Sequence, residues 1–184
     1  VLRSVKDIKA DIDNVKRISD ELAAVSIKLG HDVRITREVG SVLLQAEPSL
    51  YDNHCFITVF NWLASGGKTA FLQDANTIIM RADELIEVLK RLRETLKTLE
   101  RVTSYARSKT LAQRKLEDLK AIREAGLDRL HVGLESGNDE VLARIRKGVT
   151  SAELIEGGQK AMDAGFQLSE YWMPGLGGKE AWAA

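Results

Sequence analysis

The chain has 184 residues, with 27 lysines and arginines against 27 aspartates and glutamates, so its formal net charge is zero. This balance provides no overall attraction to nucleic acid or to membrane surfaces. The apolar runs are shorter than the roughly 20 residues of a membrane span, and no signal peptide begins the sequence. A single cysteine excludes an intrachain disulfide framework. The composition therefore predicts a cytoplasmic protein with one ordinary globular core.

The N-terminal part, residues 1–67, is predicted to be helical and to precede a separate β/α part. Residues 4–29 are expected to form one helix, because apolar residues recur at helical spacing behind Ser4, a suitable N-cap. A short helix is expected over 41–46, and a strongly apolar one from Pro48 onward. These residues carry no recognisable chemistry, so we interpret them as packing or a lid.

Residues 68–184 alternate short apolar strands with amphipathic helices, which implies right-handed crossovers and a parallel sheet. Four strands do not close a barrel, so an open doubly wound sheet is the alternative to part of a barrel. No G-x-G-x-x-G loop follows a strand to support a dinucleotide fold. We predict an α/β fold, a partial TIM-like (β/α) barrel of parallel strands. The predicted strands are 69–73, 101–105, 129–134 and 166–173, and the predicted helices are 81–97, 110–125, 139–145 and 151–164.

Polar or glycine-rich residues follow all four predicted strands, at 73–76, 104–107, 133–137 and 171–178. Chemistry in β/α barrels lies at the carboxyl ends of the strands, so these segments would surround one concave site. Each has a plainer explanation when taken alone. The first could form an Asx turn, the third an ordinary turn, and the arginine of the second could be a solvated surface residue.

The residue types in these clusters suit a zwitterionic ligand that contains a ribose. Glu135 can accept hydrogen bonds from vicinal hydroxyls, and Lys147 or Arg146 can pair with a carboxylate. Asp74 and the carbonyl groups beside it can receive an ammonium group. The glycines of 175–178 allow the backbone to approach a flat base closely.

Three segments together resemble a known family. The sequence GLDRLHVGLESG at 126–137, followed by RKG at 146–148, is similar to the fourth-strand segment of radical S-adenosylmethionine enzymes. The similarity is greatest to the branch with methylthiotransferases, elongator-type proteins and coproporphyrinogen dehydrogenase. MPGLGG at 173–178 resembles the fifth-strand motif, and 71–76 falls at the second-strand ammonium-binding motif. The likeness covers about residues 68–180.

The resemblance implies a partial (β/α)6 barrel that binds S-adenosylmethionine. Glu135 would meet the ribose hydroxyls, and Lys147, or Arg146 in its place, would meet the carboxylate of the cofactor. The second-strand residues would receive its amino group, and the fifth-strand residues would flank its adenine. The cofactor-binding residues implied are Gln73, Asp74, Ala75, Asn76, Ser104, Arg107, Glu135, Ser136, Arg146, Lys147, Met173 and Gly175.

The sequence departs from the family pattern at three places. The usual second-strand Gly-Gly-Glu is replaced by Gln-Asp-Ala at 73–75, and Tyr105 stands where some relatives carry a glutamate. The C-x-x-x-C-x-x-C segment that holds a [4Fe–4S] cluster is absent. Cys55, within an apolar run, is expected to be an inert thiol, so we assign no metal ligand here. We expect a fragment whose first strand and cluster loop precede residue 1.

Three functional hypotheses follow. The first is a fragment of a radical S-adenosylmethionine enzyme, which with its cluster segment would cleave the cofactor to a 5′-deoxyadenosyl radical. This chain alone is expected to be inactive, and it has no assigned catalytic residue. The second is a non-catalytic ligand-binding or interaction module, with self-association through the open barrel edge or the apolar region 41–63. The third, a Schiff-base barrel enzyme, is disfavoured because only Lys179 lies near a strand end. The substrate stays unidentified, and nothing indicates a nucleic-acid or membrane partner.

Overall fold

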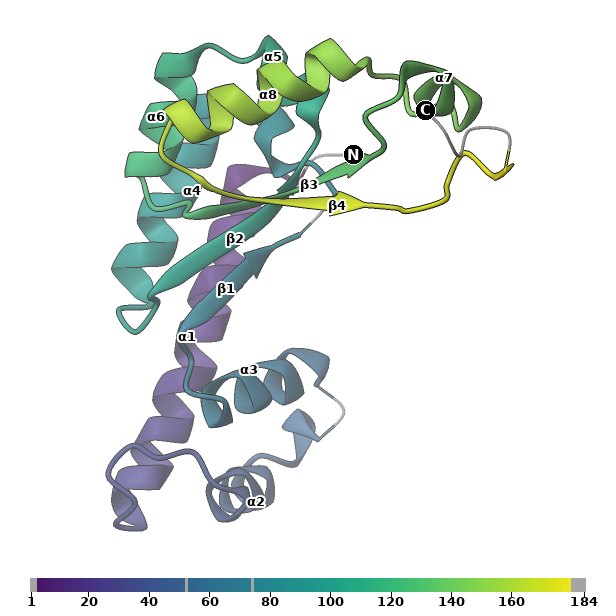
Figure 1. The fold of residues 1–184 in the computed structure, drawn as a ribbon. Helices are drawn as coiled ribbons and strands as arrows, with labels where there is room; N and C mark the ends of the chain where they lie inside the picture. Colours follow the sequence, from purple (N-terminus) through teal and green to yellow (C-terminus); the bar gives the residue numbers. More distant parts are fainter. Residues whose placement is uncertain (1–2, 52, 74, 180–184) are drawn as a thin grey trace. The chain divides into compact units, whose positions relative to one another are not determined.

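The computed structural model describes residues 3–51, 53–73 and 75–179 (Figure 1). They divide into two compact units. The first unit comprises the residues up to 68 together with 91–99, and the second comprises 69–90 and the residues from 100 onward. Among the described residues, no helix combines the length and the apolar character needed to cross a membrane.

The first unit is built around the long helix α1 (Val5–Lys28), which confirms the helix predicted there. The hydroxyl of Ser4 accepts a hydrogen bond from the backbone amide of Asp7 at 3.1 Å and so caps the helix. Helices α2 (Arg37–Ala46) and α3 (His54–Ala64) pack with α1. The buried core of this unit consists of Ile18, Leu22, Val39, Leu43, Leu50, Phe56 and Val59.

Two predicted boundaries in the first unit are wrong. Helix α2 begins well before residue 41, because the Thr36 hydroxyl caps it by accepting from the amide of Val39 at 3.3 Å. The apolar helix does not begin at Pro48, which instead starts the short 3-10 helix η1 (Pro48–Leu50). Helix α3 begins at His54, after the Asn53 side chain has accepted hydrogen bonds from two backbone amides of its first turn.

The second unit contains a parallel sheet whose four strands lie in chain order, which confirms the predicted α/β fold class. The arrangement is consistent with a partial β/α barrel, since a helix follows each of the first three strands. The strands are β1 (Thr69–Leu72), β2 (Arg101–Ala106), β3 (Arg129–Glu135) and β4 (Gln167–Trp172). The helices are η2 (Thr77–Ile79), α4 (Ala82–Thr95), α5 (Ser108–Gln113), α6 (Leu116–Glu124), α7 (Asp139–Arg144) and α8 (Ser151–Asp163).

The two faces of this sheet differ in character. Helices α5, α6 and α8 lie along one face (Figure 1), against which Val102, Leu130 and Val132 are almost fully buried. Because side chains alternate along a strand, the residues between these point to the opposite face. We call it the open face, since most of its side chains are in part exposed, although Thr103 on the same face is buried. It carries Phe71, Arg101, Tyr105, Arg129, His131, Gly133 and Tyr171.

The single helix predicted over 110–125 is wrong, because the chain forms α5 and α6 with a break between them. Arg114 and Lys115 both have extended backbone there. The Arg114 guanidinium donates to the carbonyl oxygens of Ile78 and Met80, which holds the break against the segment before α4.

Candidate functional site

The carboxyl ends of the four strands meet at one edge of the sheet, because all the strands are parallel (Figure 1). Adjacent ends are joined there by hydrogen bonds. The amide of Met173 donates to the carbonyl oxygen of Glu135 at 3.0 Å, just beyond the last paired residues of β3 and β4. The amide of Arg107 donates to the side-chain oxygen of Asn76 at 3.1 Å. Residues from all four predicted clusters therefore lie along this edge.

Glu135 ends β3 in an unusual conformation. Its φ of 64° lies in the left-handed region that non-glycine residues rarely adopt, and the pairing of β3 with β4 is irregular between Gly133 and Glu135. The bend turns the carboxylate back over Gly133, where a Cβ atom would overlap with Oε1 of Glu135. The missing side chain at Gly133 thus creates the space that the carboxylate occupies.

Lys147 approaches the same point from the other side. Its Nζ lies 2.9 Å from Oε1 of Glu135 and would lie 2.9 Å from a Cβ atom on Gly133. The two side chains of the pair keep 28% and 21% of their exposure, so the pair is accessible to a ligand from solvent. The carboxylate and ammonium group that the sequence implicated separately are therefore in direct contact.

Helix α7 and the turn after it place Lys147. The side-chain oxygen of Asn138 caps the helix by accepting from the amides of Glu140 and Val141 at 2.9 and 3.0 Å. At the other end, the amide of Lys147 donates to the carbonyl oxygen of Leu142, as in a Schellman turn. The residue that reverses the chain there is Arg146, with a φ of 53° and an exposed side chain.

The residues after β1 and β2 are placed less uniformly. Gln73 and Ala75 are exposed at the edge, and Asp74 lies outside the described residues. Both polar atoms of the Asn76 side chain are hydrogen-bonded. Its oxygen accepts from the amide of Arg107, and its nitrogen donates to the Thr110 hydroxyl at 2.9 Å. Ser104 is fully buried, and its hydroxyl donates to the carbonyl oxygen of Leu72 at 3.1 Å. Both side chains hold β1 against the neighbouring elements in this structure.

Beyond β4 the chain forms a glycine-rich loop. Gly175 has a φ of 76°, and a Cβ atom on it would find no neighbour within 4 Å. The side chain of Arg144 donates to the carbonyl oxygen of Gly177 at 2.8 Å, which anchors the loop to the end of α7. Met173 is 51% exposed at the start of the loop. Ser136 takes part in the turn before α7, where its hydroxyl accepts from the amide of Asn138 at 3.1 Å.

A cluster of four rings on the open face was not predicted from the sequence. The ring centroids of Phe71, Tyr105 and His131 lie 4.8, 5.8 and 6.0 Å apart in pairs, and that of Tyr171 lies 5.6 Å from that of His131. Burial, and secondarily the positive charges of Arg129 and Arg101, hold the pKa of His131 below its ordinary value. The alternation of residues 129, 131 and 133 was the available signal, because it places these positions on one face.

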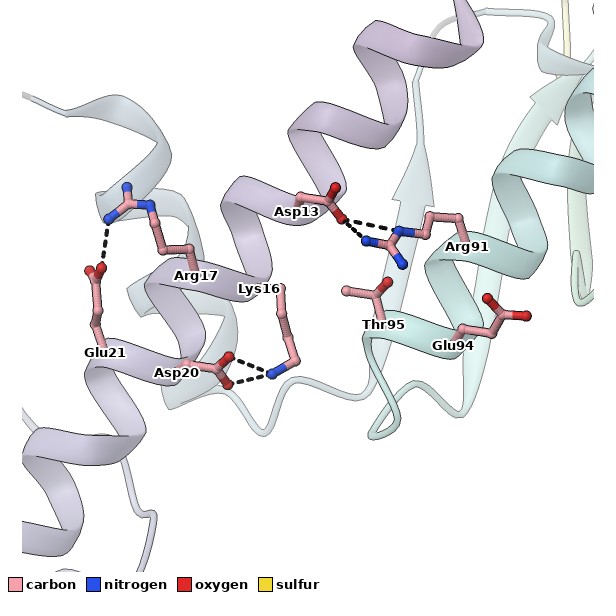
Figure 2. A pocket seen from close by; sticks show the side chains of 8 residues that line it. All are labelled: Asp13, Lys16, Arg17, Asp20, Glu21, Arg91, Glu94 and Thr95. Carbon is pink, nitrogen blue, oxygen red and sulfur yellow. Dashed lines mark hydrogen bonds and ion pairs between the residues drawn. The ribbon is translucent and has the colours of Figure 1, made fainter.

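A cavity of about 580 Å³ lies in the first unit, between α1 and the end of α4. Figure 2 shows its charged side chains in ion pairs: Asp13 with Arg91, Lys16 with Asp20, and Arg17 with Glu21. Since each of these cations is neutralised by a carboxylate, the cavity presents no cluster of unpaired charge of one sign. We do not assign it a ligand.

Nothing in the described part of the chain groups three or more histidine, cysteine, aspartate or glutamate side chains for a metal ion. Cys55, half-buried in α3, lies 3.4 Å from the side-chain nitrogen of Asn14. The Glu135–Lys147 pair, in contrast, offers the acceptor and the cation that a ribose and a carboxylate need. In a comparison with protein families, the family described as the radical SAM superfamily matches residues 11–180. No curated protein gives a significant match to the sequence.

Proposed function

We propose that this chain, which belongs to the radical SAM superfamily, binds S-adenosylmethionine at the carboxyl edge of its sheet through Glu135 and Lys147. Membership implies chemistry based on this cofactor in general. The observation that carries the residue assignment is the contact of the two side chains over the space left by Gly133. When bound and reduced, the cofactor supplies a radical that abstracts a hydrogen atom from a substrate.

The two side chains would exchange partners when the cofactor binds. The Glu135 carboxylate accepts hydrogen bonds from the two ribose hydroxyls. These hydroxyls are neutral donors, so the carboxylate needs no second cation once Lys147 has left it. Lys147 moves from Glu135 to the carboxylate of the cofactor and keeps its charge paired. Met173 lies beside Glu135 through their backbone hydrogen bond, and we assign Met173 and Gly175, two residues further on, to flank the adenine.

The amino group of the cofactor is assigned to the end of β1. Gln73 and Ala75 are exposed there, and we retain the assignment of these two residues and Asp74 from the sequence. Arg107 and Arg146 remain second candidates for the carboxylate. We leave Ser104 and Asn76 out of direct contact, because their side chains are already hydrogen-bonded within the fold.

The residues of this chain do not fit a [4Fe–4S] cluster. Three thiolates hold the cluster in this superfamily, and the sequence has one cysteine, Cys55. We propose that the cluster ligands belong to a part of the protein outside this sequence and that the chain alone does not cleave the cofactor. Within the superfamily, the segment 126–137 favours the branch of methylthiotransferases, elongator-type proteins and coproporphyrinogen dehydrogenase.

A second candidate is a binding module that takes the cofactor or another ligand without catalysis, and the single cysteine favours it. The two candidates differ in a longer gene product. After anaerobic treatment with iron and sulfide, an enzyme would show the absorption of a [4Fe–4S] cluster and cleave the cofactor on reduction. A longer product that binds the cofactor but shows neither property would support the binding module.

Isothermal titration calorimetry of the 184-residue chain with S-adenosylmethionine tests the site. We expect Glu135→Gln and Lys147→Met each to weaken binding about tenfold, the usual effect of removing one charged hydrogen-bond partner. Lys120→Met is the control, because Lys120 is exposed on α6 against the other face of the sheet. If the cofactor bound equally to all four proteins, or did not bind the unmodified chain, the proposed site would be wrong.

A further inference from the structure

The cluster of rings on the open face lies directly below the proposed cofactor site. His131 and Gly133 are alternate residues of β3 and share this face, and the bend at Glu135 places its carboxylate over the Cβ position of Gly133 on the same face. Gly133 is paired with Tyr171 in the register of β3 and β4, which brings the cluster to the level just beneath the Glu135 carboxylate. Within the cluster, Phe71 and Tyr171 are 40% and 46% exposed.

Two arginines lie below the rings on the same face. Arg129 precedes His131 by two residues on β3, and Arg101 lies on the neighbouring strand β2. Both are close enough to His131 for their charges to lower its pKa. Neither arginine has an ion pair among the described residues. The Nε of Arg129 is buried and has no hydrogen-bond partner in the described part of the chain.

A buried donor without an acceptor is rare in folded proteins, and each one calls for an explanation. An anion that binds on the open face would pair with the Arg129 guanidinium and would reach its buried Nε once the side chain shifts toward the ligand. The sheet itself offers no substitute, because Glu135 lies six residues further along β3, a distance of about 20 Å at the rise of a strand. Glu135 is also already paired with Lys147.

We propose that the open face binds a planar, conjugated ring system that carries a carboxylate or a phosphate, as the substrate of the site above it. The rings of Phe71, Tyr105, His131 and Tyr171 pack against the flat body, and Arg129 and Arg101 pair with the anionic group. From Arg129 to Gly133 the strand spans about 13 Å, which is enough for a body of two or three fused rings. This inference rests on the proposed function, because the ring end of the ligand, which is remote from its anionic group, would lie just below Glu135.

The charge distribution on this face favours an anion over a neutral or cationic ring. His131 is the third basic group of the face, and its lowered pKa keeps it uncharged near neutral pH. It therefore acts as one more flat surface, and its Nδ1 lies 3.4 Å from the Tyr171 hydroxyl. The fixed positive charge is confined to the two arginines at the lower end. The face thus has an apolar upper part and a cationic lower part.

The test measures the binding of four small probes to the 184-residue chain by calorimetry and ligand-observed NMR. The planar anions are 2-naphthoate and 2-naphthyl phosphate, and whichever binds more tightly identifies the anionic group. The neutral analogue 2-naphthalenemethanol lacks the charge, and cyclohexanecarboxylate lacks the flat rings. We expect both planar anions to bind at least about tenfold more tightly than either analogue, since each analogue loses one of the two interactions.

The variants assign each part of the effect. Arg129→Met should weaken the planar anions about tenfold and leave 2-naphthalenemethanol unchanged, whereas Tyr105→Leu should weaken all three ring-containing probes. Arg129→Lys should recover part of the affinity, because it restores the charge without the fork of donors. Arg101→Met provides a second test at an exposed position if Arg129→Met fails to fold. Arg81→Met, at the exposed start of α4, is the matched control.

Two results would overturn the inference. One is equal binding of 2-naphthoate and 2-naphthalenemethanol, and the other is an Arg129→Met variant, with an unchanged melting curve, that binds both anions as the unmodified chain does. Titration of S-adenosylmethionine in the same proteins separates this inference from the proposed function. Arg129→Met should bind the cofactor normally. If the chain bound the planar anions but not the cofactor, only the proposed function would be rejected. If it bound the cofactor but not the planar anions, only the inference would be rejected.

Discussion

The ammonium group of Lys147 lies 2.9 Å from the carboxylate of Glu135, although a helix and two turns separate the residues in the chain. The contact depends on two residues with positive φ, Glu135 itself and Arg146, one at each end of the connection. Because both side chains keep part of their exposure, the pair should contribute less than about 1 kcal/mol to the stability of the fold. The pair therefore contributes little to folding, and its proposed role is in ligand binding.

The cap of α7 should affect ligand binding as well as stability. Asn138→Ala removes the acceptor for two amides and should cost about 1 kcal/mol in the free energy of unfolding. Because α7 leads to Lys147, the affinity for S-adenosylmethionine should also fall severalfold. Asn53→Ala removes the equivalent cap of α3 in the first unit and is the control. Urea unfolding and calorimetry should show similar losses of stability in both variants and a loss of affinity in Asn138→Ala alone.

Gly133 should be needed for binding more than for folding. In Gly133→Ala the added Cβ meets only the ends of the Glu135 and Lys147 side chains, which can move at little cost in stability. We expect the affinity for S-adenosylmethionine to fall at least about tenfold while the free energy of unfolding changes by less than about 1 kcal/mol. Gly137→Ala, where the new Cβ would meet nothing within 4 Å, should bind normally. Equal affinities of the two variants would contradict the role assigned to the space over Gly133.

Two adjacent glycines of α8 should respond in opposite directions to alanine. A Cβ on Gly157 would overlap with the carbonyl oxygen of Ser108 in α5, a backbone atom that cannot turn aside. Gly157→Ala should therefore destabilise the fold by about 1–3 kcal/mol. A Cβ on Gly158 would make only ordinary contacts at 3.6 Å, so Gly158→Ala should stabilise the helix by about 0.5–1 kcal/mol. Thermal and urea unfolding of the two variants measures both signs.

The stability of the fold should depend on pH through His131. Burial lowers the pKa of this imidazole in the folded state, so the unfolded chain takes up the proton first as the pH falls. The stabilisation is present above the unfolded pKa of about 6.5 and is lost as the pH falls toward the lower folded pKa. His131→Gln should reduce the slope of the unfolding free energy against pH in this window. Identical slopes for variant and unmodified chain would show that the imidazole is not buried as described.

The second unit was predicted well from the sequence, because its strands and helices differ in period and are separated by glycines such as Gly126 and Gly165. The break between α5 and α6 was missed, since neither Arg114 nor Lys115 is a helix breaker and the cause is a long-range hydrogen bond to Ile78. The family resemblance was assigned to about residues 68–180, with the helix at 4–29 fitting the element after the cluster loop, and the family match covers residues 11–180. The helices of the first unit contain no motif residues from which a family could be recognised.

The candidate site was predicted in its residue types but not in its geometry. The sequence suggested Glu135 and Lys147 as ligands for different groups of the cofactor. Their contact depends on positive φ angles at Glu135 and Arg146, which the sequence does not reveal because neither residue is a glycine. Ser104 was proposed from its place near a strand end, and the alternation of β2 turns its hydroxyl toward the buried side. The roles of the twelve proposed residues toward a cofactor stay predictions until binding is measured.

The left-handed backbone of Glu135 has a consequence for engineering. Glycine adopts such angles without steric cost, so Glu135→Gly would relax the local backbone while it removes the carboxylate. A selection for heat resistance alone would therefore favour glycine at position 135 and yield a more stable chain without the carboxylate that we propose binds the ribose. Any programme of stabilisation for this protein needs to hold that position fixed.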